Sequence, residues 1–595
     1  MQEYTTAGDI EIAEDANITD LVWKNEHDHP EHVVFSKRSG ATFTEVTSAQ
    51  FATEVRRLAA GLLDAGIGSG DRVALMSKTR YEWVLCDFAI WTAGAVTVPV
   101  YETSSAEQVE WILRDSGAVA AFVEAAEHAA TVESVRGVDG PCRQIWRFDA
   151  HDIARLARDV AADDAALVAR HRAAGKDDLA TIIYTSGTTG RPKGCELTHG
   201  NLLYETYAAG AAFADFLNET GSLLLFVPLA HVLGRACQLT CFHARTRVGH
   251  SPDTKNLVAE LAVFKPTFLL AVPRVFEKIY NGSKQKAHAD GKGAIFDKAE
   301  HVAIAYSQAL DRGGAGLALR AQHAVFDKLV YSKLRHALGG EVRHCVSGGA
   351  PLGARLGHFF RGIGVTILEG YGLTETSAGI TSNSTGALKI GTVGRPMLGD
   401  AVRIAPDGEV LARGAQIFRG YYNNAAATRA AFTADGWFCT GDVGELDKDG
   451  YLTITGRKKE ILVTAGGKNV APAVLEDRLR AHALVSQCMV VGDGKPFVGA
   501  LVTVDADALR AWRKQHGQDE TVSVAALVDD AALRAEIQTA VAEANKAVSA
   551  AESIKVFRIL PVDFTEEGGQ MTPSLKLKRA VVMQEFATDV EAIYG

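Results

Sequence analysis

The sequence predicts an α/β fold: a large multi-subdomain N-terminal body with layered sheets and helices, followed by a small α+β C-terminal domain. The chain of 595 residues is too long for a single hydrophobic core. Helical and strand-like patterns alternate from about residue 50 to 480, which favours layered α/β architecture. The pattern changes just after Gly456, so we place the boundary between domains 1–457 and 458–595.

Hydrophobic periodicity and turn residues predict the individual elements. In the body, helices and strands are expected to alternate: helices over 51–65, over 81–92 and from Ser105, strands over 72–77 and 96–100. A segment rich in Ala, Lys, Gln and Leu predicts a helical excursion over 284–338.

The C-terminal domain has its own pattern. Strands are predicted over 485–491 and 497–504, joined by a tight turn at Gly492-Asp493-Gly494. Two Ala-rich stretches, 523–529 and 530–550, are predicted to be helical.

Composition and charge exclude several classes of protein. Hydrophobic residues make up 47% and charged residues 23%, which is typical of a soluble globular protein. The net charge is −10 and no extended basic run is present, so nucleic-acid binding is not expected.

The cysteines and the apolar segments bear on location. Eight cysteines are scattered without a C-x-x-C pair, so we expect reduced thiols in a cytoplasmic protein, not a zinc site or a disulfide framework. The acidic, polar N-terminus does not resemble a signal peptide. The longest apolar stretch, 84–100, contains Asp87, Gly94 and Pro99 and predicts a core helix and a strand instead of a membrane span.

The most specific motif is the loop YTSGTTGRPKG, residues 184–194. An apolar strand is expected over 179–184, and a helix is expected to begin near Thr198. The glycines let backbone N–H groups approach an anion, while the hydroxyls and Lys193 add donors, as a polyphosphate requires. The spacing is not that of a Walker A loop. A flexible surface loop is the alternative, but linkers rarely combine Gly, Thr, Pro and Lys in this order.

This loop resembles the phosphate-binding signature of the adenylate-forming superfamily, which includes acyl-CoA synthetases, amino-acid adenylation domains and firefly-type luciferases. Further motifs of that family occur in the right order, so the resemblance covers nearly the whole chain. It implies that Lys193 acts on the phosphates of ATP. The loop residues implied to hold ATP are Thr185, Ser186, Gly187, Thr188, Thr189 and Gly190.

Two later segments resemble the family's nucleotide contacts. Gly348, Gly349 and Ala350 resemble its adenine-binding turn. The segment EGYGLTET resembles the one in which a tyrosine stacks on adenine, a threonine approaches the α-phosphate and a glutamate holds Mg²⁺. The residues in those roles are Glu369, Gly370, Tyr371 (stacking), Gly372, Thr374 (phosphate) and Glu375 (metal). Thr185 is implied to join Glu375 at the metal, since such a cation prefers carboxylate, hydroxyl and water oxygens.

A third element, Thr440-Gly441-Asp442, resembles the one whose carboxylate grips both ribose hydroxyls. Charged acceptors make the stronger hydrogen bonds, so an aspartate suits two vicinal hydroxyls. Arg457, fifteen residues later, resembles a second contact to ribose or phosphate.

The last motif, from Thr572 to Arg579, resembles the C-terminal segment that carries the catalytic lysine. Many family members have Gly-Lys there, whereas this chain has Leu575-Lys576, as long-chain enzymes do. We assign Lys576, because a Lys-x-x-Arg alignment then places Arg579 correctly. Lys578 and a solvated basic tail are the alternatives.

The resemblance implies two half-reactions. In the first, an acyl carboxylate attacks the α-phosphorus of ATP and pyrophosphate leaves, while Lys576, Lys193 and Mg²⁺ neutralise charge. In the second, coenzyme A thiolate attacks the acyl-adenylate and AMP leaves. The small mobile C-terminal domain is implied to rotate between them about a hinge at Lys459.

Several features resemble the long-chain branch of the family. His231 resembles the residue at the mouth of the acyl pocket, although a buried core histidine is the alternative. Arg235, the excursion 284–338 and the stretch 435–460 also resemble that branch, and we expect Arg235 to lie near the substrate. The resemblance therefore implies a long-chain fatty acid–CoA ligase acting on ATP, fatty acid and coenzyme A.

Other functions are weighed against this one. A fatty-acyl-AMP ligase or an amino-acid adenylation domain would feed a carrier protein, and a non-catalytic sensor would only bind acyl nucleotides. The joint presence of Lys193, Glu375, Asp442 and Lys576 weighs against the sensor. The sequence leaves open the acyl chain length, a homodimer and a peripheral contact with the inner face of the membrane.

Overall fold

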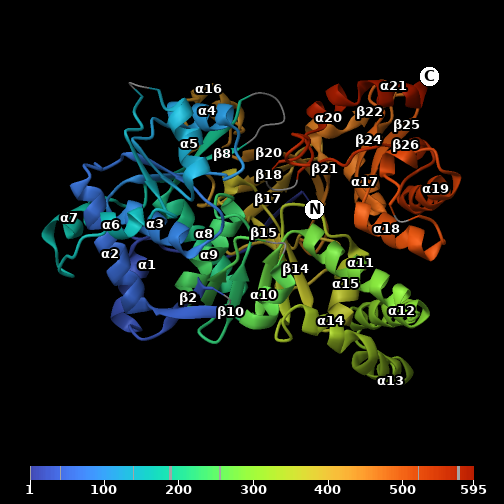
Figure 1. The fold of residues 1–595 in the computed structure, drawn as a ribbon, viewed down its shortest axis with the longest axis horizontal. Coiled ribbons are helices and arrows are strands. Elements are labelled where there is room, and N and C mark those ends of the chain that lie inside the picture. The colour runs from blue at the N-terminus through green and yellow to red at the C-terminus, as the bar shows by residue number, and fades with distance from the viewer. Residues whose placement is uncertain are drawn as a thin grey trace.

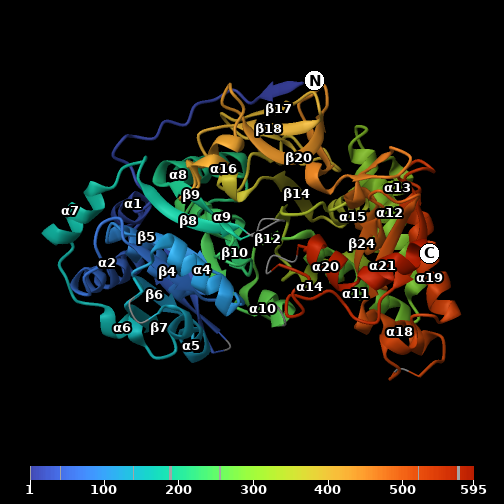
Figure 2. The same ribbon diagram turned by 90° about the horizontal axis from the view of Figure 1, so that it is seen from above.

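The computed structural model describes residues 2–40, 42–137, 140–185, 191–253, 256–519, 521–572 and 576–595. Figures 1 and 2 show a layered body on one side and a smaller C-terminal lobe beside it. Near the N-terminus, strand β1 (Glu3–Thr5) pairs with β17 (Ala401–Ile404). The start of the chain therefore belongs to the sheet nearest the lobe.

One sheet of the body carries the glycine-rich loop. Its order is β19-β9-β8-β5-β4-β6-β7, parallel from β8 to β7 and antiparallel at the β8–β9–β19 edge. The strands are β4 (Arg72–Met76), β5 (Val96–Val100), β6 (Ala120–Val123), β7 (Gln144–Arg147), β8 (Leu179–Thr185), β9 (Lys193–Thr198) and β19 (Gly420–Tyr421).

A second sheet has the order β16-β15-β14-β13-β12-β10-β11-β2-β3 and is parallel from β14 to β2. Its strands are β2 (Val33–Ser39), β3 (Thr42–Thr47), β10 (Ser222–Leu225), β11 (Arg247–His250), β12 (Phe268–Ala271), β13 (His344–Ser347), β14 (Thr366–Tyr371), β15 (Thr381–Ser382) and β16 (Arg395–Pro396). Helices pack against both sheets, as Figure 2 shows.

A third sheet, of order β1-β17-β18-β20-β21, is antiparallel and leads into the lobe. Its strands are β1 (Glu3–Thr5), β17 (Ala401–Ile404), β18 (Glu409–Arg413), β20 (Phe438–Leu446) and β21 (Leu452–Arg457). The lobe holds the sheet β24-β25-β26 and the ribbon β22-β23. These strands are β22 (Leu462–Val463), β23 (Asn469–Val470), β24 (Val485–Val491), β25 (Val498–Val504) and β26 (Ile554–Ile559).

The helices of the body follow the alternation that the sequence predicts. They are α1 (Asp20–Asp28), α2 (Ser48–Asp64), α3 (Tyr81–Thr92), α4 (Ala106–Ser116), α5 (Ala126–Val135), α6 (Asp152–Leu156), α7 (Ala165–Ala173), α8 (His199–Ala212), α9 (Val232–His243), α10 (Leu257–Phe264), α15 (Ala354–Gly362) and α16 (Ala425–Ala430). Capping explains two of the starts, because Ser105 and Thr198 accept the N–H groups of Gln108 and Asn201.

The segment 284–338 is helical. It contains the end of α11 (Pro273–Ala289), then α12 (Gly293–Leu310), α13 (Leu317–Phe326) and α14 (Ser332–Ala337), with a π-turn at Asp327–Tyr331. In Figure 1, α12 and α13 extend from the body below the C-terminal lobe.

The helices of the lobe differ from the prediction in one place. They are α17 (Pro472–Arg480), α18 (Ala506–Gln515), α19 (Ala531–Asn545), α20 (Arg579–Glu585) and α21 (Ala587–Tyr594). The stretch 530–550 forms α19, but 523–529 forms only a short 3₁₀ turn at Val524–Ala526, so that helix prediction is wrong. The alanines there have high helix propensity, but the segment is too short to gain much from it.

Body and lobe have separate hydrophobic cores. The main cluster of the body runs from Ile18 to Leu452, and the clusters of the lobe begin at Val470. The predicted boundary between residues 457 and 458 lies between these cores. The eight cysteines are free thiols, and among the described residues no helix is long and apolar enough to span a membrane.

A buried acid lies beneath the turn that follows β14. Asp400 is fully buried, and its Oδ2 accepts a hydrogen bond of 2.5 Å from the Gln416 amide nitrogen. Asp400 Oδ1 and Gln416 Oε1 both lie within 2.3 Å of the position that a Cβ would take on Gly414, and neither has a partner among the described residues. A proton on Asp400 would let the acid donate to the amide oxygen. Burial raises the pKa of Asp400 to about 8, which favours this protonated form.

Replacing this acid by its amide is expected to change the pH dependence of stability. The unfolded chain releases the Asp400 proton near a pKa of about 3.9, whereas the folded protein keeps it to about 8. Stability is therefore lost as the pH rises between these values. Asp400→Asn keeps an acceptor for the Gln416 amide nitrogen, offers an N–H group to the Gln416 amide oxygen, and should raise the melting temperature at pH 8 more than at pH 5. Thermal scans with the exposed Asp9→Asn as control test this, and an equal shift at both pH values would contradict it.

Candidate nucleotide and acyl site

The β8–β9 hairpin brackets the glycine-rich loop. Thr185 at the end of β8 pairs with Lys193 at the start of β9, and the Thr185 hydroxyl lies 3.5 Å from the Lys193 carbonyl oxygen that accepts from it. The sequence predicted an unbroken loop from residue 184 to the helix at Thr198, so strand β9 was missed. The predicted phosphate-binding residues Ser186, Gly187, Thr188, Thr189 and Gly190 lie outside the described residues.

A tyrosine that sequence reasoning did not select joins Lys193 to Glu375. The Lys193 ammonium lies 4.2 Å from the centre of the Tyr421 ring. The Tyr421 hydroxyl donates a hydrogen bond of 2.8 Å to Glu375 Oε1. Glu375 belongs to a 3₁₀ turn at Thr374–Thr376, just beyond β14. No sequence motif points to Tyr421, because only the pairing of β19 with β9 brings this residue near Lys193.

The residues predicted to hold Mg²⁺ lie together. Glu375 and Thr185 both approach the Cys195 thiol, whose pKa is raised by burial and by the charge of Glu375. Among the described residues no group of three or more His, Cys, Asp or Glu side chains gathers to hold a metal. One carboxylate and one hydroxyl fit a magnesium ion bound mainly through phosphate and water oxygens. When bound, such an ion neutralises phosphate charge.

The predicted adenine-binding turn and Tyr371 end adjacent strands. Gly348 and Gly349 directly follow β13, and Tyr371 ends β14, its parallel neighbour. Because carboxyl ends of parallel strands meet at one edge of a sheet, this edge is a frequent ligand site. Gly372 has no room for a side chain, since a Cβ there would lie 1.6 Å from the Ala378 carbonyl oxygen.

Glu369 of β14 binds the loop that follows β13. Its Oε2 accepts a hydrogen bond of 3.1 Å from the Leu352 N–H group, which closes the turn beyond Ala350. Burial, with a smaller contribution from Asp477 of the lobe, raises the pKa of Glu369 to about 7. The influence of Asp477 shows that α17 lies close to the carboxyl end of β14.

Asp442 and Arg457 lie directly opposite each other in the β20–β21 pair. This register explains the fifteen-residue spacing in the sequence. Arg457 Nε lies 3.3 Å from Asp442 Oδ1, and the Tyr371 hydroxyl donates to Asp442 Oδ2 over 2.7 Å. The predicted adenine-stacking and ribose-binding residues are thus in contact. Burial raises the pKa of Asp442, against the opposing effects of Arg457, Tyr371 and Lys576.

Lys576 lies at the boundary between lobe and body. Its backbone N–H donates to the Thr572 hydroxyl over 3.0 Å and its carbonyl accepts from the Thr572 N–H over 2.8 Å. Its side chain reaches solvent, but the surrounding protein lowers the pKa of its ammonium, as does Arg457. Negative charges oppose this shift; they belong to Asp442, Glu375 and Glu460. The lysine therefore faces the ribose-binding and metal-binding residues.

Arg579 anchors the segment that carries Lys576. Its Nε lies 3.3 Å from Glu460 Oε2, its Nη1 donates to the Val490 carbonyl over 3.3 Å, and its Nη2 pairs with Glu476. Arg579 is therefore not part of a solvated tail. Lys578 directly precedes α20 and donates its backbone N–H to the Gln570 carbonyl.

His231 caps helix α9 beside Lys576. Its Nδ1 accepts a hydrogen bond of 3.1 Å from the Leu233 N–H group. Burial lowers the pKa of His231 to about 3, and the charge of Lys576 contributes. The ring is therefore neutral at physiological pH, and the proton must sit on Nε2 because Nδ1 is an acceptor.

Arg235 is not placed to contact a substrate, so this prediction needs correction. Its guanidinium is fully buried and binds both oxygens of Asp87, over 2.8 and 2.5 Å. It also donates to the Thr181 hydroxyl over 2.6 Å and lies 4.7 Å from the Trp91 ring centre. The sequence pointed to Arg235 only through its resemblance to the long-chain branch, whereas in the structure Arg235 holds α3, α9 and β8 together.

Lys459, the predicted hinge, lies in a short 3₁₀ turn at Lys458–Glu460 between β21 and the lobe. Its side chain is exposed. Its neighbour Lys458 is held to the body by Asp407 over 2.6 Å and by Glu409 over 2.7 Å. Lys458 is thus the last residue of this turn that contacts the body, whereas Glu460 contacts Arg579 of the lobe.

Comparisons with known proteins agree with this arrangement. The profile of the AMP-binding enzyme family matches residues 22–422, and that of the AMP-binding enzyme C-terminal domain matches residues 459–595. The chain is 54% identical to the long-chain-fatty-acid–CoA ligase FadD15 of Mycobacterium bovis and 53% identical to that of Mycobacterium tuberculosis, over the full length of each chain.

A solved structure shares the fold. The A domain of carboxylic acid reductase from Segniliparus rugosus, in complex with AMP and a co-purified carboxylic acid, superposes with a TM-score of 0.75 at 20% identity. The match covers 98% of this chain and 94% of that one. The chain belongs to the AMP-binding enzyme family, and its predicted place in the long-chain fatty acid–CoA ligase branch is confirmed.

The assignment of Arg235 to the core can be tested by removing its charge. Arg235→Met leaves Asp87 buried without its charged partner, which should lower the free energy of unfolding by about 3–5 kcal/mol. The preference among acyl chain lengths should not change. Urea unfolding followed by tryptophan fluorescence measures the loss, and the double variant Asp87→Leu/Arg235→Met should recover part of it. Unchanged stability together with an altered chain-length preference would contradict this account.

Proposed function

We propose that the protein converts a long-chain fatty acid, ATP and coenzyme A into acyl-CoA, AMP and pyrophosphate through an acyl-adenylate. The observation that carries this proposal is the convergence of Lys576 with His231, Asp442 and Glu375. Each of these residues comes from a different part of the chain, and we infer that together they would surround the reacting carboxylate and α-phosphate. The name of the full-length relatives from two mycobacteria supports the long-chain substrate.

The first half-reaction needs positive charge between two anions. The surrounding protein and Arg457 lower the pKa of Lys576, but Asp442, Glu375 and Glu460 act in the opposite direction and favour the ammonium form. A charged Lys576 would attract the fatty carboxylate to the α-phosphate and stabilise the charge that develops as pyrophosphate leaves. Lys193 and Thr374 would act on the phosphates, and Tyr371, Asp442 and Arg457 on the nucleoside.

His231 would help to orient the acyl group. The neutral ring receives the Leu233 N–H group at Nδ1 and so presents a donor at Nε2. A neutral donor can bind the acyl oxygen without competing with Lys576 for the negative charge. This proposal gives His231 a polar role beside an otherwise apolar substrate.

The second half-reaction would follow rotation of the C-terminal domain. We propose that residues 458–595 move as a unit about Lys459, which lies between the contacts of Lys458 to the body and those of Glu460 to Arg579. The movement would withdraw Lys576 and let coenzyme A reach the acyl-adenylate. Hinges of this kind need only a few residues that absorb the backbone change.

Other parts of the proposal rest on the sequence-based resemblance. Mg²⁺ would be held by Glu375 and Thr185, which fit it chemically. A homodimer, a cytoplasmic location and peripheral contact with the inner face of the membrane stay predictions. An acyl-AMP ligase that feeds a carrier protein is the alternative function, and it differs in the acceptor of the acyl group.

The direct test is acyl-CoA and AMP formation from ATP, Mg²⁺, coenzyme A and fatty acids of graded length. We expect acyl-CoA with long chains and a loss of about 10²-fold or more in Lys576→Ala, because the charge that joins carboxylate and phosphate is removed. Lys578→Ala is the matched control and should retain most activity. Pyrophosphate release without acyl-CoA would favour the acyl-AMP ligase, and absence of both products would contradict the proposal.

A further inference from the structure

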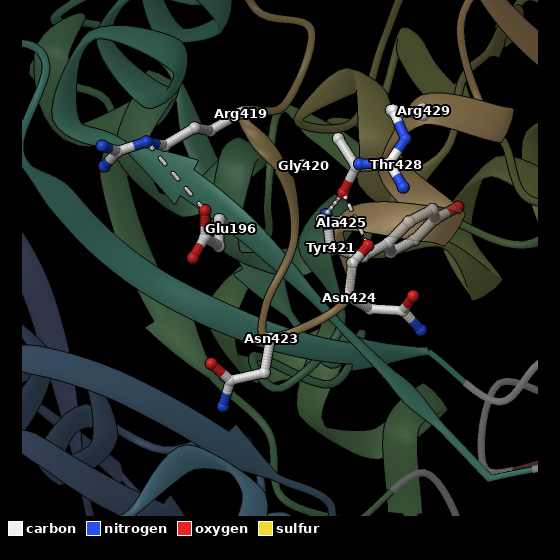
Figure 3. A pocket seen from close by; sticks show the side chains of 9 residues that line it. All are labelled: Glu196, Arg419, Gly420, Tyr421, Asn423, Asn424, Ala425, Thr428 and Arg429. Atoms are coloured by element: carbon white, nitrogen blue, oxygen red, sulfur yellow. Dashed lines mark hydrogen bonds and ion pairs between the residues drawn. The ribbon is translucent and has the colours of Figure 1, made fainter.

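Tyr421 connects two residues that the mechanism uses and the sequence places far apart. It ends strand β19, which pairs with β9 so that Tyr421 lies opposite Cys195, two residues from Lys193. Figure 3 shows Tyr421 on the wall of a hollow that Arg419, Asn424 and Arg429 also line. The tyrosine therefore contacts both this hollow and Lys193.

The hydroxyl of Tyr421 determines how Glu375 is held. It donates to Oε1 over 2.8 Å, and the backbone N–H of Phe418 donates to the Glu375 carbonyl over 2.8 Å. The same strand segment thus holds both the side chain and the main chain of Glu375. A cation bound at Glu375 would therefore meet a carboxylate whose orientation the Tyr421 hydroxyl restrains. A hydrogen bond to an ionised carboxylate is among the stronger ones in proteins.

The ring of Tyr421 acts on the other residue. The Lys193 ammonium lies 4.2 Å from the ring centre, within the range of a cation–π interaction. A flexible lysine side chain has many rotamers, and the aromatic face favours the one that keeps the ammonium over the Tyr421 ring. One side chain therefore restrains both a positive and a negative group of the site.

The surroundings make Tyr421 a rigid support. Its ring packs edge-on against Phe418 at 4.9 Å, and Phe418 stacks on Phe432 at 5.9 Å. Its backbone N–H donates to the hydroxyl of Thr428, a residue of α16, over 2.9 Å. Tyr421 cannot change rotamer without disturbing this aromatic cluster, so the positions of Glu375 and Lys193 depend on a preformed element.

We propose that Tyr421 is a positioning residue of the adenylation step, whose hydroxyl orients Glu375 toward the magnesium ion and whose ring holds Lys193 toward the phosphates. This inference rests on the proposed function, because it assigns the two restrained groups to MgATP. It predicts two separable effects. Loss of the hydroxyl weakens only the magnesium-dependent part of nucleotide binding, whereas loss of the ring also weakens the part due to Lys193.

The test measures nucleotide binding and does not depend on turnover. Calorimetric titration with ATP is performed with Mg²⁺ and with EDTA for the intact chain, Tyr421→Phe and Tyr421→Leu. Tyr421→Phe should bind MgATP about tenfold more weakly, as expected for a lost hydrogen bond to a charged group, and should bind ATP in EDTA as the intact chain does. Tyr421→Leu should lose affinity under both conditions. Tyr422→Phe is the control, since that neighbouring residue packs against the cluster around β5 and β8.

The outcomes separate positioning from a general structural role. Equal losses in Mg²⁺ and EDTA for Tyr421→Phe, or no loss at all, would overturn the proposal. A lower melting temperature in Tyr421→Leu would show only that the ring stabilises the fold. It would not explain why the isosteric Tyr421→Phe loses affinity for ATP with Mg²⁺ and not in EDTA. The three proteins could differ in MgATP affinity as predicted while the intact chain forms no acyl-CoA. The proposed function would then fail, but the role of Tyr421 in nucleotide binding would stand.

Discussion

The pairing of β20 with β21 is the constraint on which the candidate site depends. It places Asp442 opposite Arg457, and the Asp442 carboxylate accepts a hydrogen bond from the Tyr371 hydroxyl at the end of β14. The same hairpin ends at Arg457, directly before the turn that leads into the C-terminal lobe. A shift of this register by one residue would turn Asp442 away from Tyr371 and would also change the direction in which the lobe leaves the body.

Charge balance follows from this arrangement. Lys576 comes from the lobe and meets Asp442 and Glu375 from the body, so the contact between domains is also an electrostatic contact within the site. Its effect on His231 links the nucleotide region to the proposed mouth of the acyl pocket. The buried pair of Arg235 and Asp87 joins α9, which His231 caps, to α3. Lys576 and Arg235 are both cations, but Arg235 is fully buried and paired with Asp87, whereas the Lys576 side chain reaches solvent.

Much of this could be predicted from the sequence, because the strongest signals are local. Helix α3 and strands β5 and β24 have the predicted bounds, since apolar runs and turn residues define them without help from distant segments. The family motifs also led to Asp442, Glu375 and Lys576, which the structure brings together. Strand β9 was missed because its glycine and polar residues resemble a loop, and only pairing with β8 and β19 makes it a strand. Arg235 and Tyr421 required three-dimensional information, since their roles depend on Asp87 and Glu375 at distant positions.

The central claim is that Lys576 acts in adenylation and not in thioester formation. The most direct measurement supplies preformed acyl-adenylate and coenzyme A to Lys576→Ala and follows acyl-CoA formation. We expect a rate close to that of the intact chain, because the step that needs the lysine has been bypassed. A loss as large as that seen with ATP and free fatty acid would contradict it, since Lys576 would then serve both half-reactions or the fold of the lobe.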